Sequence, residues 1–268
     1  MSEHRTALIT GASSGFGLEF ARLFARDGFD LVLVARSGEM MEELAKLLDA
    51  RFGNSIIVLP KDLSKAHAVG ELVGDLRQRG VTIDVLVNNA GFAQYGPFVE
   101  AEPAELVDML QVNVVALTEL TRALMPGMVE RGWGRIVNLG SVGSFAPAPM
   151  TGAYAATKAF VLSFSLALTE ELKGTGVTVT ALCPGPTATG FQARAAMADS
   201  KLIAGRRLDS ADDVVRAGYH AMRKGRPFLV TGTTSKAFAF GSRFLPRTTA
   251  AKIAARSQQR ITDWKGSA

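Results

Sequence analysis

The sequence is short of the residues on which several classes of protein depend. Its 268 residues include one cysteine, Cys183, and three histidines. A single cysteine excludes an internal disulfide and a cysteine-rich metal site, and we expect no bound metal. Cys183 ends an apolar run before Pro184, where the expected state is a buried, unreactive thiol.

Long hydrophobic runs are also lacking, although 47% of the residues are hydrophobic. The longest uninterrupted apolar stretches have the length of strands, well short of the ~20 residues that cross a bilayer. Strand-like sequence begins by Thr6, which leaves no room for a signal peptide. We therefore expect a cytoplasmic protein, and a chain of this length fits one large domain.

An excess of positive charge is absent from most of the chain. Residues 235–268 contain seven Lys and Arg against one acid, or +6, whereas residues 1–234 contain 23 bases and 24 acids, or −1. The net charge of +5 therefore belongs to a basic extension, residues 235–268, that follows a domain of residues 1–234. This distribution gives no sign of a nucleic-acid partner.

The sequence does contain a glycine-rich turn between a strand and a helix. An apolar strand, Thr6–Thr10, runs into glycines at positions 11, 15 and 17, and a helical pattern continues to Phe24. These glycines permit a tight turn and close approach of the backbone, and they leave amides free at the helix N-terminus. The arrangement is typical of a turn that receives a pyrophosphate.

The same turn also fits a nucleophile elbow, because Gly11–Gly15 reads Gly-x-Ser-x-Gly between a strand and a helix. A serine hydrolase would also need a histidine late in the chain, after its acid. His220 is the histidine nearest to that position, and it falls in the helical stretch Ala211–Arg223 rather than in a loop. A serine hydrolase is therefore a remote alternative.

Further strands and helices follow in alternation along the chain. Helical patterns cover residues 40–48 and 103–131, the latter with Pro126 bending its end, and another helix begins at Gly152. This alternation predicts an α/β fold with a Rossmann-type doubly wound parallel sheet of about seven strands and helices on both faces. The six strands expected after the first are Asp30–Ala35, Ser55–Leu59, Ile83–Val87, Arg135–Leu139, Val177–Leu182 and Pro227–Val230.

Residues that suit a cofactor follow three of these strands, at the edge where such sheets bind ligands. Arg36 stands where an NAD enzyme usually carries an acid, and it suits a 2′-phosphate; a solvated arginine is the alternative. Asp62 follows the third strand, as a ligand contact or as a local turn or cap. Asn88–Gly91 closes the fourth strand, as a place of close cofactor approach or as a simple turn.

The pair Tyr154 and Lys158 lies on one face of the helix that begins at Gly152, since residues four apart are neighbours there. A phenol has an unperturbed pKa near ~10, and a neighbouring ammonium lowers that pKa toward the working range of an acid or base. Ser141 is delivered by the fifth strand. It can hydrogen-bond the substrate oxygen that exchanges a proton with Tyr154. Asn113, unfavourable inside a helix, indicates a structural water or a function.

In their order and spacing these motifs resemble the short-chain dehydrogenase/reductase family over roughly residues 5–232. The resemblance implies that Tyr154 is the acid/base and that Lys158 lowers its pKa and binds the nicotinamide ribose. It also implies that Ser141 orients the carbonyl oxygen and that Asn113 anchors a proton-relay water.

The same resemblance assigns the cofactor-binding residues. It implies that Asp62 holds the adenine, Asn89 the neighbouring ribose, and the loop after Pro184 the carboxamide. Arg36, with Ser13 rather than a base inside the glycine turn, is similar to an NADP-preferring pattern of the family. Besides Tyr154 and Lys158, the cofactor set is Gly11, Ser13, Ser14, Gly15, Phe16, Gly17, Arg36, Asp62, Leu63, Asn89, Ala90, Gly91, Pro184, Gly185, Thr187 and Thr189.

The expected function is NADP(H)-dependent transfer of hydride between nicotinamide and a hydrophobic ketone or secondary alcohol, in a homodimer or homotetramer. Substrate-lining residues are expected in 91–98, 142–150 and 187–207, with the last segment as a lid. Because the first two are mostly apolar, they favour an apolar substrate. A non-catalytic NADP-binding regulatory or scaffold protein is the main alternative.

The basic extension predicts an amphipathic helix. Lys252, Arg256 and Arg260 recur every four residues, and an apolar face is expected from Ile253, Ile261 and Trp264. In one interpretation this helix packs on the domain or on another subunit. In the other it attaches to an anionic membrane surface, with apolar contacts from Phe238, Phe240 and Phe244.

Overall fold

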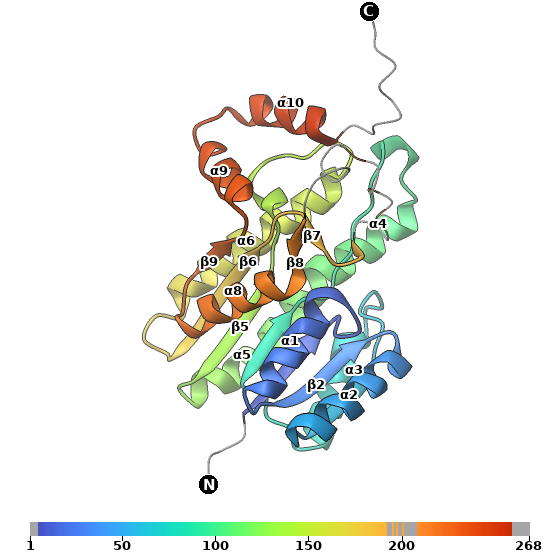
Figure 1. Ribbon diagram of the computed structural model, residues 1–268, viewed down its shortest axis with the longest axis vertical. Coiled ribbons are helices and arrows are strands. Elements are labelled where there is room, and N and C mark those ends of the chain that lie inside the picture. Colours follow the sequence, from blue (N-terminus) through green and yellow to red (C-terminus); the bar gives the residue numbers. More distant parts are fainter. Residues whose placement is uncertain (1–4, 192–194, 196, 198–199, 201–207, 259–268) are drawn as a thin grey trace, which may run out of the picture.

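A parallel sheet in the order β3-β2-β1-β4-β5-β6-β9 forms the centre of the molecule in this computed structural model, which describes residues 5–191, 195, 197, 200 and 208–258 (Figure 1). Its seven strands confirm the predicted fold, and every predicted strand is present within about two residues of its expected ends. The strands are β1 Thr6–Thr10, β2 Asp30–Ala35, β3 Ile56–Pro60, β4 Val85–Asn88, β5 Gly134–Leu139, β6 Val177–Cys183 and β9 Phe228–Val230. A separate small sheet pairs β7, Thr187–Ala188, with β8, Asp209–Ser210.

Helices cover both faces of the sheet. One face packs against α1 (Gly15–Arg26), α2 (Gly38–Phe52) and α8 (Ala211–Arg223), and the other against α3 (Ala68–Gln78), α5 (Leu117–Glu130) and α6 (Gly152–Glu171). Successive strand residues point to opposite faces, so Ile9 joins the first buried cluster and Leu8 the second. Strands with uninterrupted apolar interiors, such as Ala7–Ile9 of β1 and Leu31–Val34 of β2, are favoured because both faces are covered.

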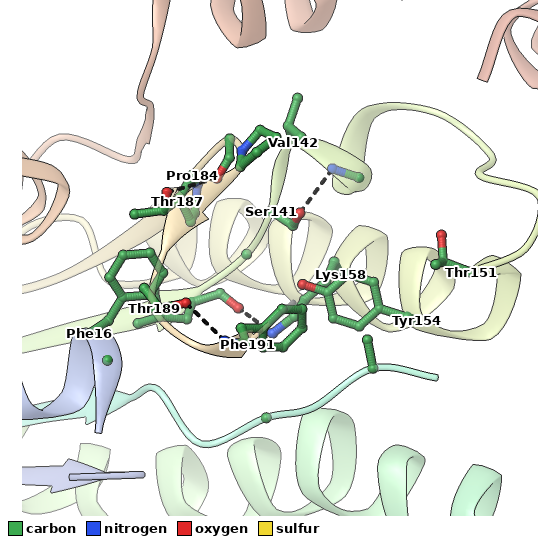
Figure 2. Close-up of a pocket in the computed structure, with 18 of the residues that line it drawn as sticks. Phe16, Ser141, Val142, Thr151, Tyr154, Lys158, Pro184, Thr187, Thr189 and Phe191 are labelled. Carbon is green, nitrogen blue, oxygen red and sulfur yellow. Dashed lines mark hydrogen bonds between the residues drawn. The ribbon is translucent and has the colours of Figure 1, made fainter. Parts of the chain in front are cut away.

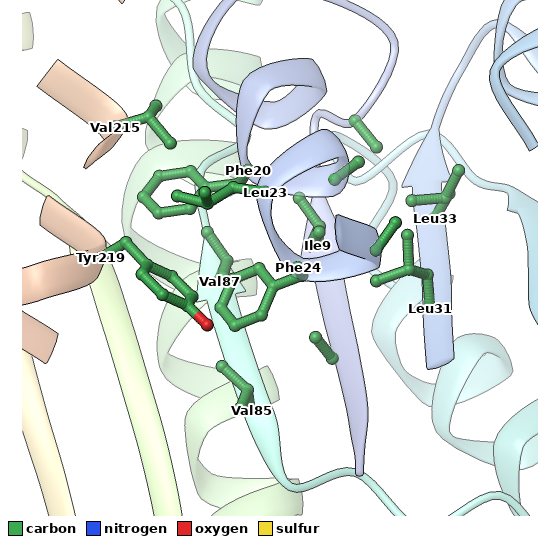
Figure 3. Packing of buried hydrophobic residues seen from close by; sticks show 14 of the residues in the cluster. Ile9, Phe20, Leu23, Phe24, Leu31, Leu33, Val85, Val87, Val215 and Tyr219 are labelled. Carbon is green, nitrogen blue, oxygen red and sulfur yellow. The ribbon is translucent and has the colours of Figure 1, made fainter. Parts of the chain in front are cut away.

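Aromatic packing joins α1 to α8 on the first face, as Figure 3 shows. The ring of Phe24 meets the ring of Tyr219 edge-on, with centroids 5.0 Å apart. The Tyr219 hydroxyl donates a 2.8 Å hydrogen bond to Asp27 at the end of α1. Burial and that carboxylate raise the pKa of Tyr219, so this phenol is a structural donor. The cluster holds α1, and with it the glycine turn, against the sheet.

The helical stretch predicted for residues 103–131 contains an unforeseen widened turn. It consists of α4 (Pro103–Leu110), a π-helical turn (Gln111–Ala116) and α5. Asn113 lies in the π turn, fully buried, and its side chain bonds the backbone of Phe92 in both directions. Its amide also donates to Thr157 of α6. The side chain is therefore used to hold the chain after β4, and the interior asparagine marks a break in regular α-helix geometry.

The long helix α6 passes the length and composition test for a membrane span, unlike any apolar run predicted from the sequence. In the structure it packs against β5 and β6 as a covering layer of the sheet. Lys158 on this helix is only 5% exposed. Contact with the core thus accounts for part of its apolar character, while Phe160 and Leu166 remain exposed.

The basic extension folds into α9 (Thr233–Gly241) and α10 (Arg247–Gln258), at the end of the molecule where the strands carry their carboxyl termini (Figure 1). Ala239 of α9 packs beside Cys183 and Val230. The predicted helix is present, but the predicted apolar face is wrong for Ile253, which is 47% exposed. Instead Ala250, Ala254 and Gln258 are buried, and their four-residue spacing places them on one face. Arg260, Ile261 and Trp264 lie outside the described residues.

Candidate active site

The end of β5 delivers Ser141 to the mouth of the site. Ser141 caps the short 3-10 helix Val142–Phe145, and its Oγ accepts a 3.1 Å hydrogen bond from the Gly143 amide. Ser144 completes the capping box by accepting from the Ser141 amide, and it donates a 2.7 Å hydrogen bond to the carbonyl of Lys158. Ser144 thus ties the strand end to α6, a role that the sequence analysis missed.

Helix α6 presents Tyr154 and Lys158 beside Ser141, as predicted from their spacing (Figure 2). Ser141 lies in the same cavity wall as Tyr154, where it lowers the pKa of the Tyr154 hydroxyl. The Lys158 Nζ lies 5.6 Å from the centroid of the Tyr154 ring and donates a 2.7 Å hydrogen bond to the carbonyl of Leu139. Three side chains from two elements therefore meet at the carboxyl edge of the sheet.

The pKa of Tyr154 shifts in the direction opposite to the one predicted. Burial raises it to about 12, the Ser141 hydrogen bond lowers it by a smaller amount, and Cys183 adds a smaller rise. The Lys158 ammonium donates its hydrogen bond to the Leu139 carbonyl rather than to the Tyr154 hydroxyl. Desolvation of the phenolate is therefore the dominant effect, and Tyr154 is protonated at neutral pH.

Burial acts on the two neighbouring groups as well. It lowers the pKa of Lys158 to about 8, against a smaller opposing effect of Cys183. It raises the pKa of the Cys183 thiol to about 12, which keeps this buried thiol protonated, as expected for an unreactive cysteine. Lys158 thus retains most of its positive charge at neutral pH but titrates far below the ordinary lysine value.

The glycine turn and the chain after β4 form a cradle that is packed too closely for side chains at Gly17 and Gly91. A Cβ on Gly17 would lie 2.2 Å from the Gly11 carbonyl oxygen, and one on Gly91 would lie 2.9 Å from Asn113 Oδ1. Ser14 precedes α1 without making a side-chain cap, which leaves the first amides of this helix available to an anion. This donor set fits the pyrophosphate of a dinucleotide.

Asn89 stabilises the same turn through its side chain. Its Nδ2 donates to the carbonyls of Thr10 and Gly11, at 2.8 and 3.2 Å. The Thr10 hydroxyl in turn accepts from the amides of Asn89 and Ala90. The end of β4 is thereby fixed to the end of β1, so Asn89 shapes the cradle as well as lining it.

One cavity of about 200 Å³ joins the cradle to the three catalytic candidates. The wall of this cavity contains many of the site residues that were predicted from the sequence: Gly11, Ser14, Gly15, Phe16, Asn89, Ala90, Gly91, Ser141, Tyr154, Lys158, Pro184, Gly185, Thr187 and Thr189. Figure 2 shows strands β5 and β6 delivering Ser141 and Pro184 to one side of it. These residues therefore line one continuous cavity.

Six predicted residues lie outside the wall of this cavity: Ser13, Gly17, Arg36, Asp62, Leu63 and Asn113. Gly17 and Asn113 support the wall without lining it, through the close packing of Gly17 and the hydrogen bonds of Asn113 described above. Asp62 accepts a 3.1 Å hydrogen bond from the Ser64 amide, which is the turn interaction considered as its alternative. Leu63 is buried in the apolar cluster on the α3 side of the sheet, and Arg36 is exposed after β2.

The cavity also contains residues that the sequence analysis did not single out: Leu139, Gly140, Thr151, Ala155, Pro186 and Gln258. The first four flank motif residues, and position 186 follows the Pro184-Gly185 motif, so proximity along the chain would have found them. Gln258 comes from α10, and no motif points to it. Phe191 and Met197 were expected within 187–207, most of which beyond residue 191 lies outside the described residues.

The serine hydrolase alternative finds no support in this geometry. No histidine belongs to the cavity wall formed by the described residues, and His220 is exposed on α8. Ser13 lies outside that wall as well. The residues present fit a dinucleotide and a carbonyl group instead.

Comparison with known proteins agrees with this conclusion. A model of the short chain dehydrogenase family matches residues 5–199. A short-chain dehydrogenase from Sphingobium yanoikuyae, solved with NADPH, superimposes with a TM-score of 0.80 at 36% identity, over 90% of this chain and 94% of that one. The bulky-bulky ketone specific alcohol dehydrogenase of Comamonas testosteroni superimposes with a TM-score of 0.77 at 32% identity, over 91% of this chain and 93% of that one. The chain belongs to the short-chain dehydrogenase family.

Curated relatives match over a shorter part. A ketoacyl reductase of Nostoc is 36% identical over 181 residues, 68% of this chain and 63% of that protein. A very-long-chain 3-oxoacyl-CoA reductase of Mycosarcoma maydis is 37% identical over 66% of this chain and 51% of its own length. The NADP-dependent 3-hydroxy acid dehydrogenase of Escherichia coli is 38% identical over 66% of this chain and 71% of its own length. The chain therefore spans about half to two thirds of the first two of these relatives.

Proposed function

We propose that the protein is an NADP(H)-dependent oxidoreductase that transfers hydride between nicotinamide and a hydrophobic ketone or secondary alcohol. The observation that carries this proposal is the meeting of Ser141, Tyr154 and Lys158 in the wall of a cavity that continues into the glycine cradle. NADPH supplies the hydride when it is bound. The remaining chemistry at a carbonyl group is movement of one proton, for which these side chains are suited.

Tyr154 is the proton donor in this proposal. Its pKa of about 12 keeps the hydroxyl protonated at neutral pH, ready to give its proton to the carbonyl oxygen. Ser141, in the same cavity wall, donates to the same oxygen and stabilises the charge that develops there. Carbonyl reduction is the proposed direction, because it begins with the protonated form of Tyr154 that is present at neutral pH.

Lys158 keeps a positive charge close to the reacting groups. Its pKa of about 8 leaves it mostly charged at neutral pH, and the Leu139 carbonyl holds its Nζ in place. This charge stabilises the tyrosinate that remains after proton transfer. Asn113 maintains the neighbouring chain through Phe92. That it also anchors a relay water stays a prediction.

NADP(H) is the proposed cofactor in preference to NAD(H). Arg36 is exposed after β2 and is available to a 2′-phosphate, and no acidic residue stands at this position. The similar Sphingobium dehydrogenase was solved with NADPH, and the similar E. coli enzyme is NADP-dependent. Ser13, Asp62 and Leu63 are proposed to complete the adenosine end of the site.

An apolar substrate fits the rest of the cavity. Beyond the catalytic groups its wall is lined by Ala93, Ala148, Phe191 and Met197, and the Phe191 ring lies 5.6 Å from that of Tyr154. A panel of ketones, aldehydes and alcohols followed by the absorbance of NADPH tests this proposal. Oxidation of NADPH by apolar ketones supports it, whereas tight NADPH binding with no turnover on the panel favours the scaffold alternative.

The extension is proposed to reach a membrane surface while packing on its own domain. Phe240 and Phe244 are 64% and 73% exposed, and exposed Arg243 and Arg247 lie beside them in sequence. This combination suits peripheral contact with anionic lipid. Salt-sensitive co-sedimentation with anionic vesicles, lost in a Phe240→Ser, Phe244→Ser variant, tests it. That the protein is cytoplasmic stays a prediction.

A homodimer or homotetramer is proposed from apolar side chains on the helices beside the site. Val107 and Leu110 of α4 are exposed, as are Phe160 and Leu166 of α6. Exposed apolar groups gathered on neighbouring helices favour association. Light scattering of the purified protein measures its state directly, and a monomer at micromolar concentration would contradict this proposal.

A further inference from the structure

The basic extension places one polar side chain inside the active-site cavity. Gln258, at the end of α10, is 7% exposed and belongs to the same wall as Tyr154 and Ser141. It lies 59 residues beyond residue 199, the last residue matched to the family model. The family motifs therefore account for the proton-transfer groups, while this part of the wall comes from a segment outside the matched region.

Hydrogen bonds hold Gln258 in position from two directions. The Tyr95 hydroxyl donates to its main-chain carbonyl, and its Nε2 lies 3.2 Å from Thr151 Oγ1. Thr151 immediately precedes α6, the helix that carries Tyr154. The end of the extension is thereby connected to both the chain after β4 and the start of the catalytic helix.

The side-chain amide of Gln258 keeps one polar atom without a partner. Its Oε1 is buried and makes no hydrogen bond among the described residues. A threonine hydroxyl can donate as well as accept, so either orientation of the amide leaves one hydrogen-bonding atom free. A buried unpaired amide atom is unfavourable unless something else satisfies it. Gln258 itself belongs to the wall of the cavity.

We propose that Gln258 recognises a second polar group of the substrate, a hydroxyl or an amide N–H placed away from the carbonyl that is reduced. Because Oε1 is the unpaired atom of this amide, the substrate group must be a hydrogen-bond donor. The substrate class is then an otherwise apolar ketone or secondary alcohol with a distal donor. This inference rests on the proposed function, because it assigns the reacting carbonyl to Tyr154 and Ser141.

A matched series of ketones tests the contact. Each pair exchanges a terminal hydroxyl for a methyl group: 4-hydroxy-2-butanone with 2-pentanone, 5-hydroxy-2-pentanone with 2-hexanone, and 6-hydroxy-2-hexanone with 2-heptanone. For the pair whose length reaches Gln258, the wild-type enzyme should show a kcat/KM for the hydroxyketone at least roughly 10-fold above that for the alkanone.

Removal of the amide should abolish this preference without harming the chemistry. In Gln258→Leu the ratio of kcat/KM within that pair should fall to about one or below, with turnover of the alkanone retained. Gln78→Leu, which changes an exposed glutamine at the end of α3, should leave the ratio unchanged. Thr151→Val removes the hydroxyl that orients the amide and should reduce the ratio as well, even if Gln258→Leu disturbs α10.

Binding measured by ligand-observed NMR separates this inference from the proposed function. If the wild-type protein reduces none of the ketones but binds the hydroxyketone better than its alkanone, and Gln258→Leu loses that difference, the inference stands while the reductase proposal falls. The inference is overturned if no pair shows a preference in turnover or binding, or if Gln258→Leu and Thr151→Val both retain the preference.

Discussion

The Lys158 ammonium and the Leu139 carbonyl are joined by a 2.7 Å hydrogen bond across the cavity floor, between α6 and the last residue of β5. The bond places a buried cation where the strand presents a carbonyl dipole. Burial nevertheless dominates and lowers the pKa of Lys158 from 10.5 to about 8. Burying this ammonium costs stability, as the lowered pKa shows. That the lysine is nevertheless buried indicates a functional requirement for its charge.

The lowered pKa of Lys158 predicts a pH dependence of stability. Between pH 8 and 10.5 the unfolded chain binds more protons at this lysine than the folded protein does, so this group makes stability rise with pH. From about pH 7.5 to about pH 9.5 the wild type should gain roughly 2 kcal/mol relative to Lys158→Met. Urea unfolding of both proteins at the two pH values measures this difference, in which other titrating groups largely cancel. Equal pH dependence of the two proteins would show that Lys158 titrates normally.

Gly17 is predicted to tolerate no side chain. In Gly17→Ala the new Cβ would meet the backbone oxygen of Gly11 at 2.2 Å, so the turn must open and NADPH affinity should fall at least roughly 10-fold. Gly74→Ala is the matched control, because a Cβ at this α3 position meets nothing within 4 Å. It should stabilise the fold by about 0.5–1 kcal/mol and leave NADPH binding unchanged. Fluorescence titration and thermal unfolding report both quantities, and unaltered binding by Gly17→Ala would remove the cradle from the cofactor site.

Arg36 is predicted to distinguish the two nicotinamide cofactors. Loss of a cation that pairs with a phosphate should weaken NADPH by roughly 10-fold or more in Arg36→Ala, while NADH binding changes little. Lys46→Ala removes an exposed cation from α2 and serves as the control for a general change in charge. Dissociation constants for both cofactors are the measurement. If NADPH and NADH weaken equally, the arginine does not contact the 2′-phosphate.

The fold and most of the site were predictable because their signals are local. Apolar strands such as Thr6–Thr10, the glycines that follow, and the four-residue spacing of Tyr154 and Lys158 each specify structure within a short segment. The topology then brings the strand ends together, and the cavity residues with them.

The features that were missed depend on packing between distant segments. The direction of the Tyr154 pKa shift follows from burial, which a sequence pattern does not report. The π turn around Asn113 depends on its contacts with Phe92 and Thr157. Gln258 reaches the cavity because α10 folds back over the carboxyl edge of the sheet, and a glutamine in a basic tail carries no periodic signal.

Turnover by Tyr154→Phe tests the central claim most directly. Phenylalanine keeps the ring beside Phe191 and removes only the hydroxyl. With an apolar ketone that the wild type reduces, kcat should fall by roughly 10²-fold or more while the dissociation constant for NADPH stays within about threefold. Phe160→Tyr, on the exposed side of the same helix, should change neither value and controls for aromatic exchange on α6. Retention of wild-type kcat by Tyr154→Phe would contradict the assignment of Tyr154 as the proton donor.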